Sequence, residues 1–288
     1  MPPTRTSFKS CWEVLEKSLP RPSRVRKLLR RDWEGFKERV EREDELFCKS
    51  IVSSLYAGDC YVLSEAFDKD FMLYLKDKAF KFFQSEPSSF HQMKEGVKDF
   101  HKKIDLEEGR KYSFQVCKHA AYYFPWNEDP IFEPINERWR VIKKLMGLKE
   151  TEYETNTPKE GVVDRIQLAQ YPNRVGFLEP HSDPYLHQRL FISGYVCQRG
   201  RDYQGGGFYL VGNGNEVVDA EQDISIGDIG IGYATVYHGV SPCNREQPTN
   251  WDSDEGRWFL GLYSNVSDEV KDRHTGSSAK LNLPGVMP

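Results

Sequence analysis

The 288-residue sequence has few cysteines and no C-x-x-C pair. Its six cysteines stand singly, at Cys11, Cys48, Cys60, Cys117, Cys197 and Cys243. This pattern excludes a zinc ribbon and a small disulfide framework, and it favours free thiols in a reducing compartment. Long hydrophobic runs are also missing, since no stretch approaches the ~20 apolar residues that a membrane span needs. The polar segment Met1–Trp12 lacks the apolar stretch of a secretory signal. We therefore expect a cytoplasmic protein without a membrane partner.

A strong excess of one charge is absent as well. The chain has 40 Lys and Arg against 44 Asp and Glu, a net charge of -4, which disfavours a dedicated nucleic-acid binder. A basic cluster, Arg24 to Arg31, is followed at once by acidic residues, which favours a solvated helix face over a phosphate contact. With 38% hydrophobic and 13% aromatic residues the chain has enough apolar material for a core, so intrinsic disorder is excluded.

Helical periodicity dominates the first half of the chain. With Ser23 as the N-cap, apolar residues recur in steps of three and four, at Val25, Leu28, Leu29, Trp33, Phe36 and Val40, which predicts one helix. Residues 1–60 are thus expected to form a helical N-terminal extension. A short strand at Tyr61–Leu63, a helix after Ser64 and a helix over Ile131–Gly147 follow.

After Gly161 the sequence changes to short apolar runs separated by Gly, Asn, Asp and Pro. These predict strands in the vicinity of residues 163–170, 190–196, 207–211, 217–218, 224–226, 229–237 and 258–263. Many short strands at such spacing are typical of a β-sandwich or barrel, with a jelly roll among the options. No repeat or linker divides the chain, so we expect a single domain over residues 1–288.

Two short motifs carry candidate metal ligands. His181 and Asp183 are two positions apart, so on one strand their side chains lie on the same face. His238 follows on a later strand, ahead of a Gly-Val-Ser-Pro turn. Two imidazoles and one carboxylate on one face form the facial triad of non-haem Fe(II) oxygenases, which leaves open positions for a co-substrate and O2.

Arg257 stands on an otherwise apolar strand after the last of these histidines. A buried cation is costly unless an anion meets it. A dicarboxylate co-substrate would supply that anion, because a guanidinium can bind a carboxylate through two parallel hydrogen bonds.

Together these motifs make the stretch from Val163 to Tyr263 resemble the Fe(II)/2-oxoglutarate-dependent oxygenases, in the layout of their prolyl-hydroxylase-like branch. The matching positions are Tyr171, His181-Ser-Asp183, Gly205–Gly207, Gly227-Asp228, His238-Gly-Val240 and Arg257. The resemblance implies an α+β protein with a double-stranded β-helix, a jelly-roll, cupin-like barrel with flanking N-terminal helices. It also implies a metal-binding barrel core over residues 160–265.

The resemblance further implies the roles of the site residues. Fe(II) would be held by His181, Asp183 and His238, 2-oxoglutarate would chelate the metal, and O2 would be consumed, with ascorbate as a candidate auxiliary reductant. Arg257 would bind the distal carboxylate of 2-oxoglutarate, and Tyr171 would hydrogen-bond the co-substrate. Arg257 follows the last histidine at a longer interval than in the family pattern, so Arg189 is an alternative.

Gln167 is a further candidate, because alternation along the first barrel strand puts it on the same face as Tyr171. If Tyr171 points into the barrel, Gln167 does so too and could bind the co-substrate. In the alternative, Ile166 and Leu168 face the core and Gln167 faces solvent.

The implied reaction is hydroxylation of an unactivated C–H bond in a small metabolite or biosynthetic intermediate, with release of succinate and CO2. Asp183 disfavours halogenation, since halogenating members replace this carboxylate. One alternative is a peptidyl hydroxylase of the prolyl type, which would need an open groove beside the metal rather than a pocket covered by residues 85–130. Another is a jelly-roll protein that binds a ligand without catalysis.

Overall fold

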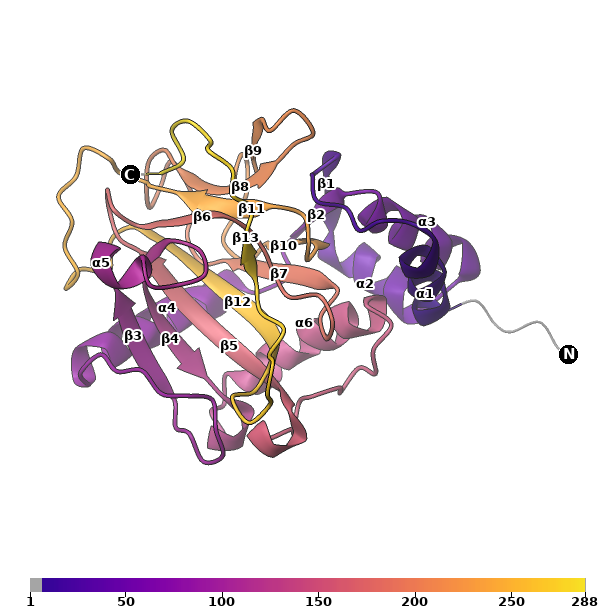
Figure 1. Ribbon diagram of the computed structural model, residues 1–288, viewed down its shortest axis with the longest axis horizontal. Helices are drawn as coiled ribbons and strands as arrows, with labels where there is room; N and C mark the ends of the chain where they lie inside the picture. Colours follow the sequence, from indigo (N-terminus) through magenta and orange to yellow (C-terminus); the bar gives the residue numbers. More distant parts are fainter. Residues whose placement is uncertain (1–6, 288) are drawn as a thin grey trace, which may run out of the picture.

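The computed structural model describes residues 7–287, so both ends of the predicted 1–288 domain lie outside the described residues. Two β-sheets face each other and enclose the interior of a barrel, and strand β4 (Val116–Tyr123) pairs with strands of both. Helices cover the outside of the larger sheet and gather at one end of the molecule (Figure 1).

The larger sheet contains strands from all parts of the chain. Its order is β1 (Lys27–Asp32), β2 (Asp59–Ser64), β10 (Ile229–Tyr233), β7 (Leu190–Tyr195), β12 (Arg257–Val266), β5 (Val162–Tyr171), β4 and β3 (Phe100–Ile104). The smaller sheet has the order β6 (Phe177–Ser182), β11 (His238–Ser241), β8 (Gly207–Val211) and β9 (Val217–Asp219).

From β5 to β12 the chain passes back and forth between the two sheets, with the consecutive strands β8 and β9 both in the smaller one. β5, β7, β10 and β12 lie in the larger sheet, and β6, β8, β9 and β11 lie in the smaller one. This alternation is that of a double-stranded β-helix, the jelly roll in which eight strands form two Greek keys. The predicted fold class is therefore confirmed.

Helices α4 (Lys69–Ser85) and α6 (Phe132–Leu145) cover the outer face of the larger sheet (Figure 1). From α4, Phe83 stacks on His119 of β4 and Trp258 of β12. From α6, Lys143 reaches Asp164 of β5, with 2.5 Å between Nζ and Oδ2. The helices are α1 (Phe8–Ser18), α2 (Trp33–Arg42), α3 (Glu45–Tyr56), α4 (Lys69–Ser85), α5 (Leu106–Gly109) and α6 (Phe132–Leu145), with 3-10 turns η1 (Pro125–Asn127) and η2 (Pro158–Glu160). No helix within residues 7–287 is long and apolar enough to cross a bilayer.

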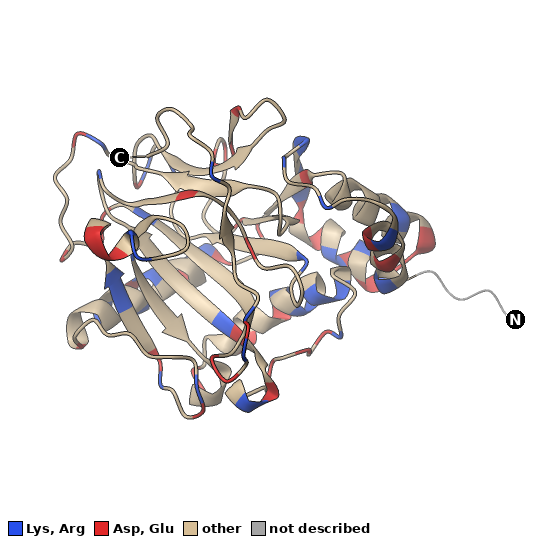
Figure 2. Ribbon diagram, in the orientation of Figure 1, with Lys and Arg blue, Asp and Glu red and all other residues tan. Residues whose placement is uncertain are grey.

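The single helix predicted from Ser23 is wrong in its first part. Lys27–Asp32 forms strand β1, which pairs in parallel with β2. The helix begins only after Asp32, whose carboxylate accepts a hydrogen bond from the Gly35 N–H. Spacings of three and four between apolar residues do not reveal a strand partner that arrives 32 residues later, at Asp59. On α2 and α3, acidic and basic residues are interspersed (Figure 2).

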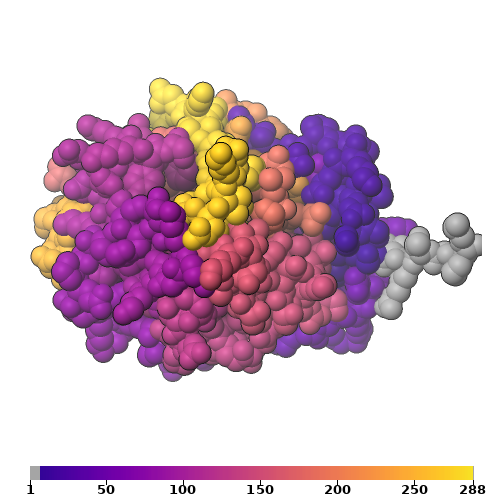
Figure 3. All heavy atoms as spheres, turned by 60° about the horizontal axis from the view of Figure 1, so that its bottom comes forward, coloured from indigo at the N-terminus to yellow at the C-terminus, as the bar shows by residue number. Residues whose placement is uncertain are grey.

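Other elements differ from the sequence patterns in smaller ways. Helix α4 starts at the cap Asp68 rather than at Ser64, and residues 224–226 form no strand. Near the C-terminus, β13 (Ser277–Ser278) pairs with β6. Figure 3 shows this yellow segment lying across the surface beside the magenta part of the chain. The helix predicted over Ile131–Gly147 is confirmed as α6.

Candidate active site

The structure brings the three candidate metal ligands together at one end of the smaller sheet. His181 on β6 and His238 on β11 are direct cross-strand partners. Asp183 follows immediately after β6, where its backbone N–H donates to the Ala234 carbonyl at 2.9 Å. One ligand atom from each of the three residues lies within 4.8 Å of the others.

Both imidazoles are oriented by backbone carbonyls. Nδ1 of His181 lies 3.0 Å from the carbonyl oxygen of Glu179, and Nδ1 of His238 lies 2.9 Å from that of Val236. These bonds leave each Nε2 facing the carboxylate of Asp183, at 3.5 and 3.6 Å. Such second contacts fix the tautomer of a metal-binding histidine.

The electrostatics of this cluster suit a divalent cation. Burial, assisted by the neighbouring His181, lowers the pKa of His238 to about 4, so its imidazole is neutral near pH 7 and keeps a free lone pair. Two imidazole nitrogens and one carboxylate on one side of a site are the ligand set that non-haem Fe(II) takes. The residues present therefore fit the metal that the sequence predicts.

Aromatic rings enclose the two imidazoles. Phe114 stacks on His181 with ring centroids 4.5 Å apart. Phe191 and Phe208 pack against His238 at 4.8 and 5.5 Å. These contacts restrict the ring orientations and keep bulk water from one side of the cluster.

A narrow cavity leads from the three ligands into the barrel and reaches Arg257. Arg257 on β12 lies opposite Tyr171 on β5, and its guanidinium carbon is 5.4 Å from the Tyr171 ring centre. The Tyr171 hydroxyl and Arg257 Nη1 are buried without hydrogen-bond partners in residues 7–287. Buried polar groups are normally paired, so these two indicate a polar ligand that belongs in the cavity. The lining residues also include Ile192, Ser193, Phe208, Val240, Phe259 and Tyr263.

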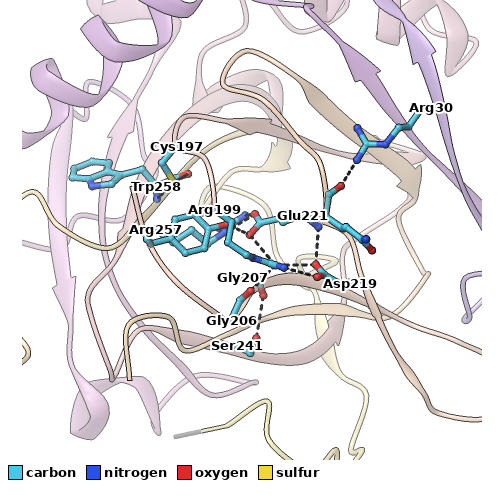
Figure 4. Close-up of polar contacts among 12 residues, drawn as sticks. Arg30, Cys197, Arg199, Gly206, Gly207, Asp219, Glu221, Ser241, Arg257 and Trp258 are labelled. Carbon is cyan, nitrogen blue, oxygen red and sulfur yellow. Dashed lines mark hydrogen bonds and ion pairs between the residues drawn. The ribbon is translucent and has the colours of Figure 1, made fainter. Parts of the chain in front are cut away.

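The other side of Arg257 meets a carboxylate that the sequence reasoning missed. Its Nε donates to Oε1 of Glu221 at 2.7 Å, and both side chains are about 1% exposed. Figure 4 shows the two side chains pointing toward one another, with Arg199 and Asp219 paired beside them. The Glu221 carboxylate also accepts a hydrogen bond from the Tyr203 hydroxyl. The only signal in the sequence was the general need of a buried cation for an anion.

The Gly205–Gly207 motif makes room for this pair. A Cβ added to Gly207 would overlap Oε2 of Glu221, and the backbone φ there is +104°. At Gly206, φ is +57° and a Cβ would overlap the Pro242 carbonyl oxygen. Both positions therefore require glycine, for conformation as well as for space.

A second cavity, of about 220 Å³, lies beyond the metal ligands. Gln167 lines it and is 3% exposed, on the same face of β5 as Tyr171. Ile166 and Leu168 are buried on the opposite face, so the alternative in which Gln167 faces solvent does not describe the fold. The two cavities share the lining residues Leu178, His181, Asp183 and Tyr263.

Arg189, the alternative to Arg257, lies elsewhere. Its guanidinium forms two hydrogen bonds with Glu16 of α1, at 2.8 and 3.0 Å, and a third with the Met146 carbonyl. It lines neither cavity. Arg189 attaches the N-terminal helix to the barrel.

The C-terminal segment is a further part of the site that the sequence did not predict. Residues 273–276 line the second cavity, together with Tyr112 and Phe114. The pairing of β13 with β6 holds this segment beside His181, since Ser278 is the cross-strand partner of His181. No local pattern indicates that the end of the chain returns to this strand.

No protein-family model matches the chain. A comparison with curated protein sequences also finds no match.

Among solved structures, the chain is similar to several of the superfamily that the sequence resembles. A Pseudomonas putida prolyl-4-hydroxylase is 14% identical, with a TM-score of 0.42 and coverage of 74% of this chain and 94% of that one. A Neurospora crassa protein in complex with alpha-KG and thymine is 13% identical, with a TM-score of 0.49 and coverage of 83% and 86%. JOX2 in complex with 2OG, Fe and JA is 16% identical, with a TM-score of 0.46 and coverage of 100% and 90%. These likenesses concern the fold, so the function rests on the residues of this chain.

Proposed function

We propose that this protein is an Fe(II)- and 2-oxoglutarate-dependent dioxygenase. The observation that carries the proposal is the cluster of His181, Asp183 and His238, whose ligand atoms converge at the mouth of a cavity that ends at Arg257. A metal-binding cluster alone fits many proteins. Three metal-ligand residues beside a cavity that ends at a buried guanidinium with an unpaired nitrogen fit a dicarboxylate that chelates the metal.

In this proposal each residue has a defined task. Nε2 of His181, Nε2 of His238 and the Asp183 carboxylate would hold Fe(II). Arg257 donates from Nη1 to the distal carboxylate of 2-oxoglutarate, and the Tyr171 hydroxyl donates to the same ligand. The bound iron and co-substrate supply the oxidising chemistry, with O2 consumed and succinate and CO2 released. The chain supplies orientation and exclusion of water.

We further propose that the substrate is a small molecule rather than a peptide. The second cavity adjoins the metal ligands and has a volume of about 220 Å³, which suits a small metabolite. Tyr112 and Phe114, from the predicted covering region 85–130, and residues 273–276 line it from different parts of the chain. A peptidyl hydroxylase of the prolyl type is the alternative, and it would have to displace these segments to admit a main chain.

We propose one functional unit over residues 1–288, with the 1–60 extension packed on a barrel core at 160–265. We place it in the cytoplasm, where its six free cysteines would stay reduced.

The test measures metal and co-substrate binding before turnover. Isothermal titration calorimetry with Mn(II), then with 2-oxoglutarate, should give binding to the wild type and to His91→Ala, which changes an exposed histidine outside the site. His181→Ala should lose Mn(II) binding, and with Fe(II) and ascorbate it should form no succinate. Absence of Mn(II) or 2-oxoglutarate binding by the wild type would contradict the proposal. Binding of both without succinate formation, across a broad substrate set, would favour the non-catalytic alternative.

A further inference from the structure

The wall of the second cavity carries more positive than negative side chains. Three cationic side chains line it, from Lys118, Arg165 and Arg273, whereas Asp183 is the one acidic residue among its described lining residues. In the proposed function Asp183 is committed to the metal. Lys118 lies on β4 and Arg165 on the neighbouring strand β5.

Arg165 lies on the inner face of β5, opposite Tyr263 of β12. Its guanidinium carbon is 5.0 Å from the Tyr122 ring centre and 5.2 Å from that of Tyr263. Within residues 7–287 it forms no ion pair, and its buried Nε has no hydrogen-bond partner. The two rings hold the guanidinium in place and leave its donors unused.

Lys118 lies on the neighbouring strand β4 and lines the same cavity. No carboxylate of the described chain lies within ion-pair distance of its ammonium group. Burial and the positive charge of Arg165 lower the pKa of Lys118 to about 7, although Asp183 acts in the opposite direction. The two cations therefore lie close enough to oppose each other's charge.

Elsewhere in the described chain, several buried or half-buried cations meet a carboxylate. Lys143 meets Asp164, Arg257 meets Glu221 and Arg189 meets Glu16. Even Arg273, in the same cavity, is paired with Asp268. Lys118 and Arg165 depart from this pattern, and both do so at the wall of the cavity that adjoins the metal ligands.

We propose that the substrate is a small organic anion whose oxyanion group is bound by Arg165 and Lys118. Gln167 adds a third donor, since its Nε2 is buried and has no partner in the described chain. The aromatic rings of Tyr122, Tyr263 and Phe114 contact the remainder of the molecule. This inference rests on the proposed function for the reaction, whereas the anion site itself depends only on the cavity. A carboxylate and a phosphate monoester share the required chemistry.

The test uses matched acids and amides on protein saturated with Mn(II) and 2-oxoglutarate. Isothermal titration calorimetry at constant ionic strength compares the affinity of hexanoate with that of hexanamide, and the affinity of phenylacetate with that of phenylacetamide. Phenyl phosphate is compared with phenylacetate and with phenylacetamide. At least one anion should bind roughly tenfold or more tightly than its neutral partner, as expected for a charge-assisted hydrogen bond. The carboxylate and phosphate arms distinguish the two sources of the oxyanion.

Variants locate the effect in the cavity. Arg165→Gln and Lys118→Gln should each abolish most of the preference for the anion. Arg165→Lys, which keeps the charge, should retain part of it. Lys271→Gln is the matched control, because Lys271 is exposed in the segment that leads to Arg273 but does not line the cavity.

Three results would overturn the inference. The first is equal binding of anions and amides, or no binding of either, at millimolar concentration. The second is an anion preference that Arg165→Gln and Lys118→Gln leave unchanged. The third is a loss of 2-oxoglutarate affinity in these variants in place of the anion preference, which would assign both cations to the co-substrate. Failure of the proposed function differs from all three, because it appears as absent Mn(II) or 2-oxoglutarate binding, and the anion panel can be repeated on metal-free protein.

Discussion

At the scale of single residues, the co-substrate end of the cavity depends on how Arg257 is neutralised. Glu221 takes the Nε side of the guanidinium, and Nη1 remains without a partner in the described chain. A carboxylate of the protein thus compensates the buried charge while one edge stays available. When a second carboxylate enters from the cavity, it meets an arginine that is already oriented.

Glu221→Gln should destabilise the free protein by about 3 kcal/mol, because it leaves a buried guanidinium without its anion. Saturating Mn(II) and 2-oxoglutarate should recover part of the lost stability, since the distal carboxylate of 2-oxoglutarate would then pair with Arg257. The measurement is urea unfolding with and without both ligands. The rise in stability on ligand addition should be larger for Glu221→Gln than for wild type.

Glu246→Gln provides the control, since the same chemical change at an exposed loop position should alter stability by less than about 0.5 kcal/mol. An equal ligand-induced rise in wild type and Glu221→Gln would show that 2-oxoglutarate does not contact Arg257.

At the scale of elements, the hairpin of β3 and β4 contains a buried histidine pair. Nδ1 of His101 lies 3.0 Å from Nε2 of His119, whose ring stacks on Phe83 of α4. Burial, with His101 and Lys103 nearby, lowers the pKa of His119 to about 3. Burial also lowers the pKa of His101. The pair holds the hairpin against α4 only in its neutral form.

This pair predicts a loss of stability in mild acid. The unfolded chain takes up a proton on His119 below about pH 6.5, whereas the folded chain does not until about pH 3. The stability that depends on neutral His119 is therefore complete above about pH 6.5 and falls as the pH drops from there toward pH 3. At pH 5 the loss of stability that His119 causes is about 2 kcal/mol. Urea unfolding gives the free energy of unfolding at pH 7.5 and at pH 5. The difference between the two values should be smaller for His119→Gln than for wild type.

The exposed His91 offers the comparison, because His91→Ala should leave the pH dependence as it is in wild type. If His119→Gln retained the full difference between the two pH values, other groups would account for the acid sensitivity.

At the scale of the whole molecule, the N-terminal helices are packed onto the barrel rather than appended to it. The Trp12 indole N–H donates to the Leu145 carbonyl of α6 at 2.7 Å, and its ring contacts Tyr56 and Tyr233. Glu16 of the same helix binds Arg189. The apolar core is continuous from α1 through the two sheets.

Trp12→Ala should therefore lower the free energy of unfolding by about 3–5 kcal/mol, because a fully buried indole is removed. Unfolding of the wild type and of the variant in guanidinium chloride is followed by tryptophan fluorescence and by far-UV circular dichroism. Each protein should show one transition, at the same denaturant concentration with both probes. Val14→Ala, on the exposed face of the same helix, should have little effect. Two separate transitions would contradict the proposal of a single unit over residues 1–288.

Local rules explain what could be predicted from the sequence. The two-residue period of a strand places Tyr171 and Gln167 on one face, and the short apolar runs between Gly, Asn and Pro predict several strands of the jelly roll, including β5, β7, β8, β10 and β12. The same rules failed at Lys27–Asp32, where the apolar spacing suits a helix but a parallel partner, β2, makes it a strand.

The sequence by itself determined several of the barrel strands and the identity of the candidate ligands, because alternation and motif order are properties of neighbouring residues. Only the tertiary structure decided that Glu221 neutralises Arg257, that Arg165 and Lys118 share one cavity wall, and that the C-terminal segment lies beside His181. These contacts join residues from distant parts of the chain. A side chain's charge partner depends on which strands become neighbours, and that depends on the packing of the whole barrel.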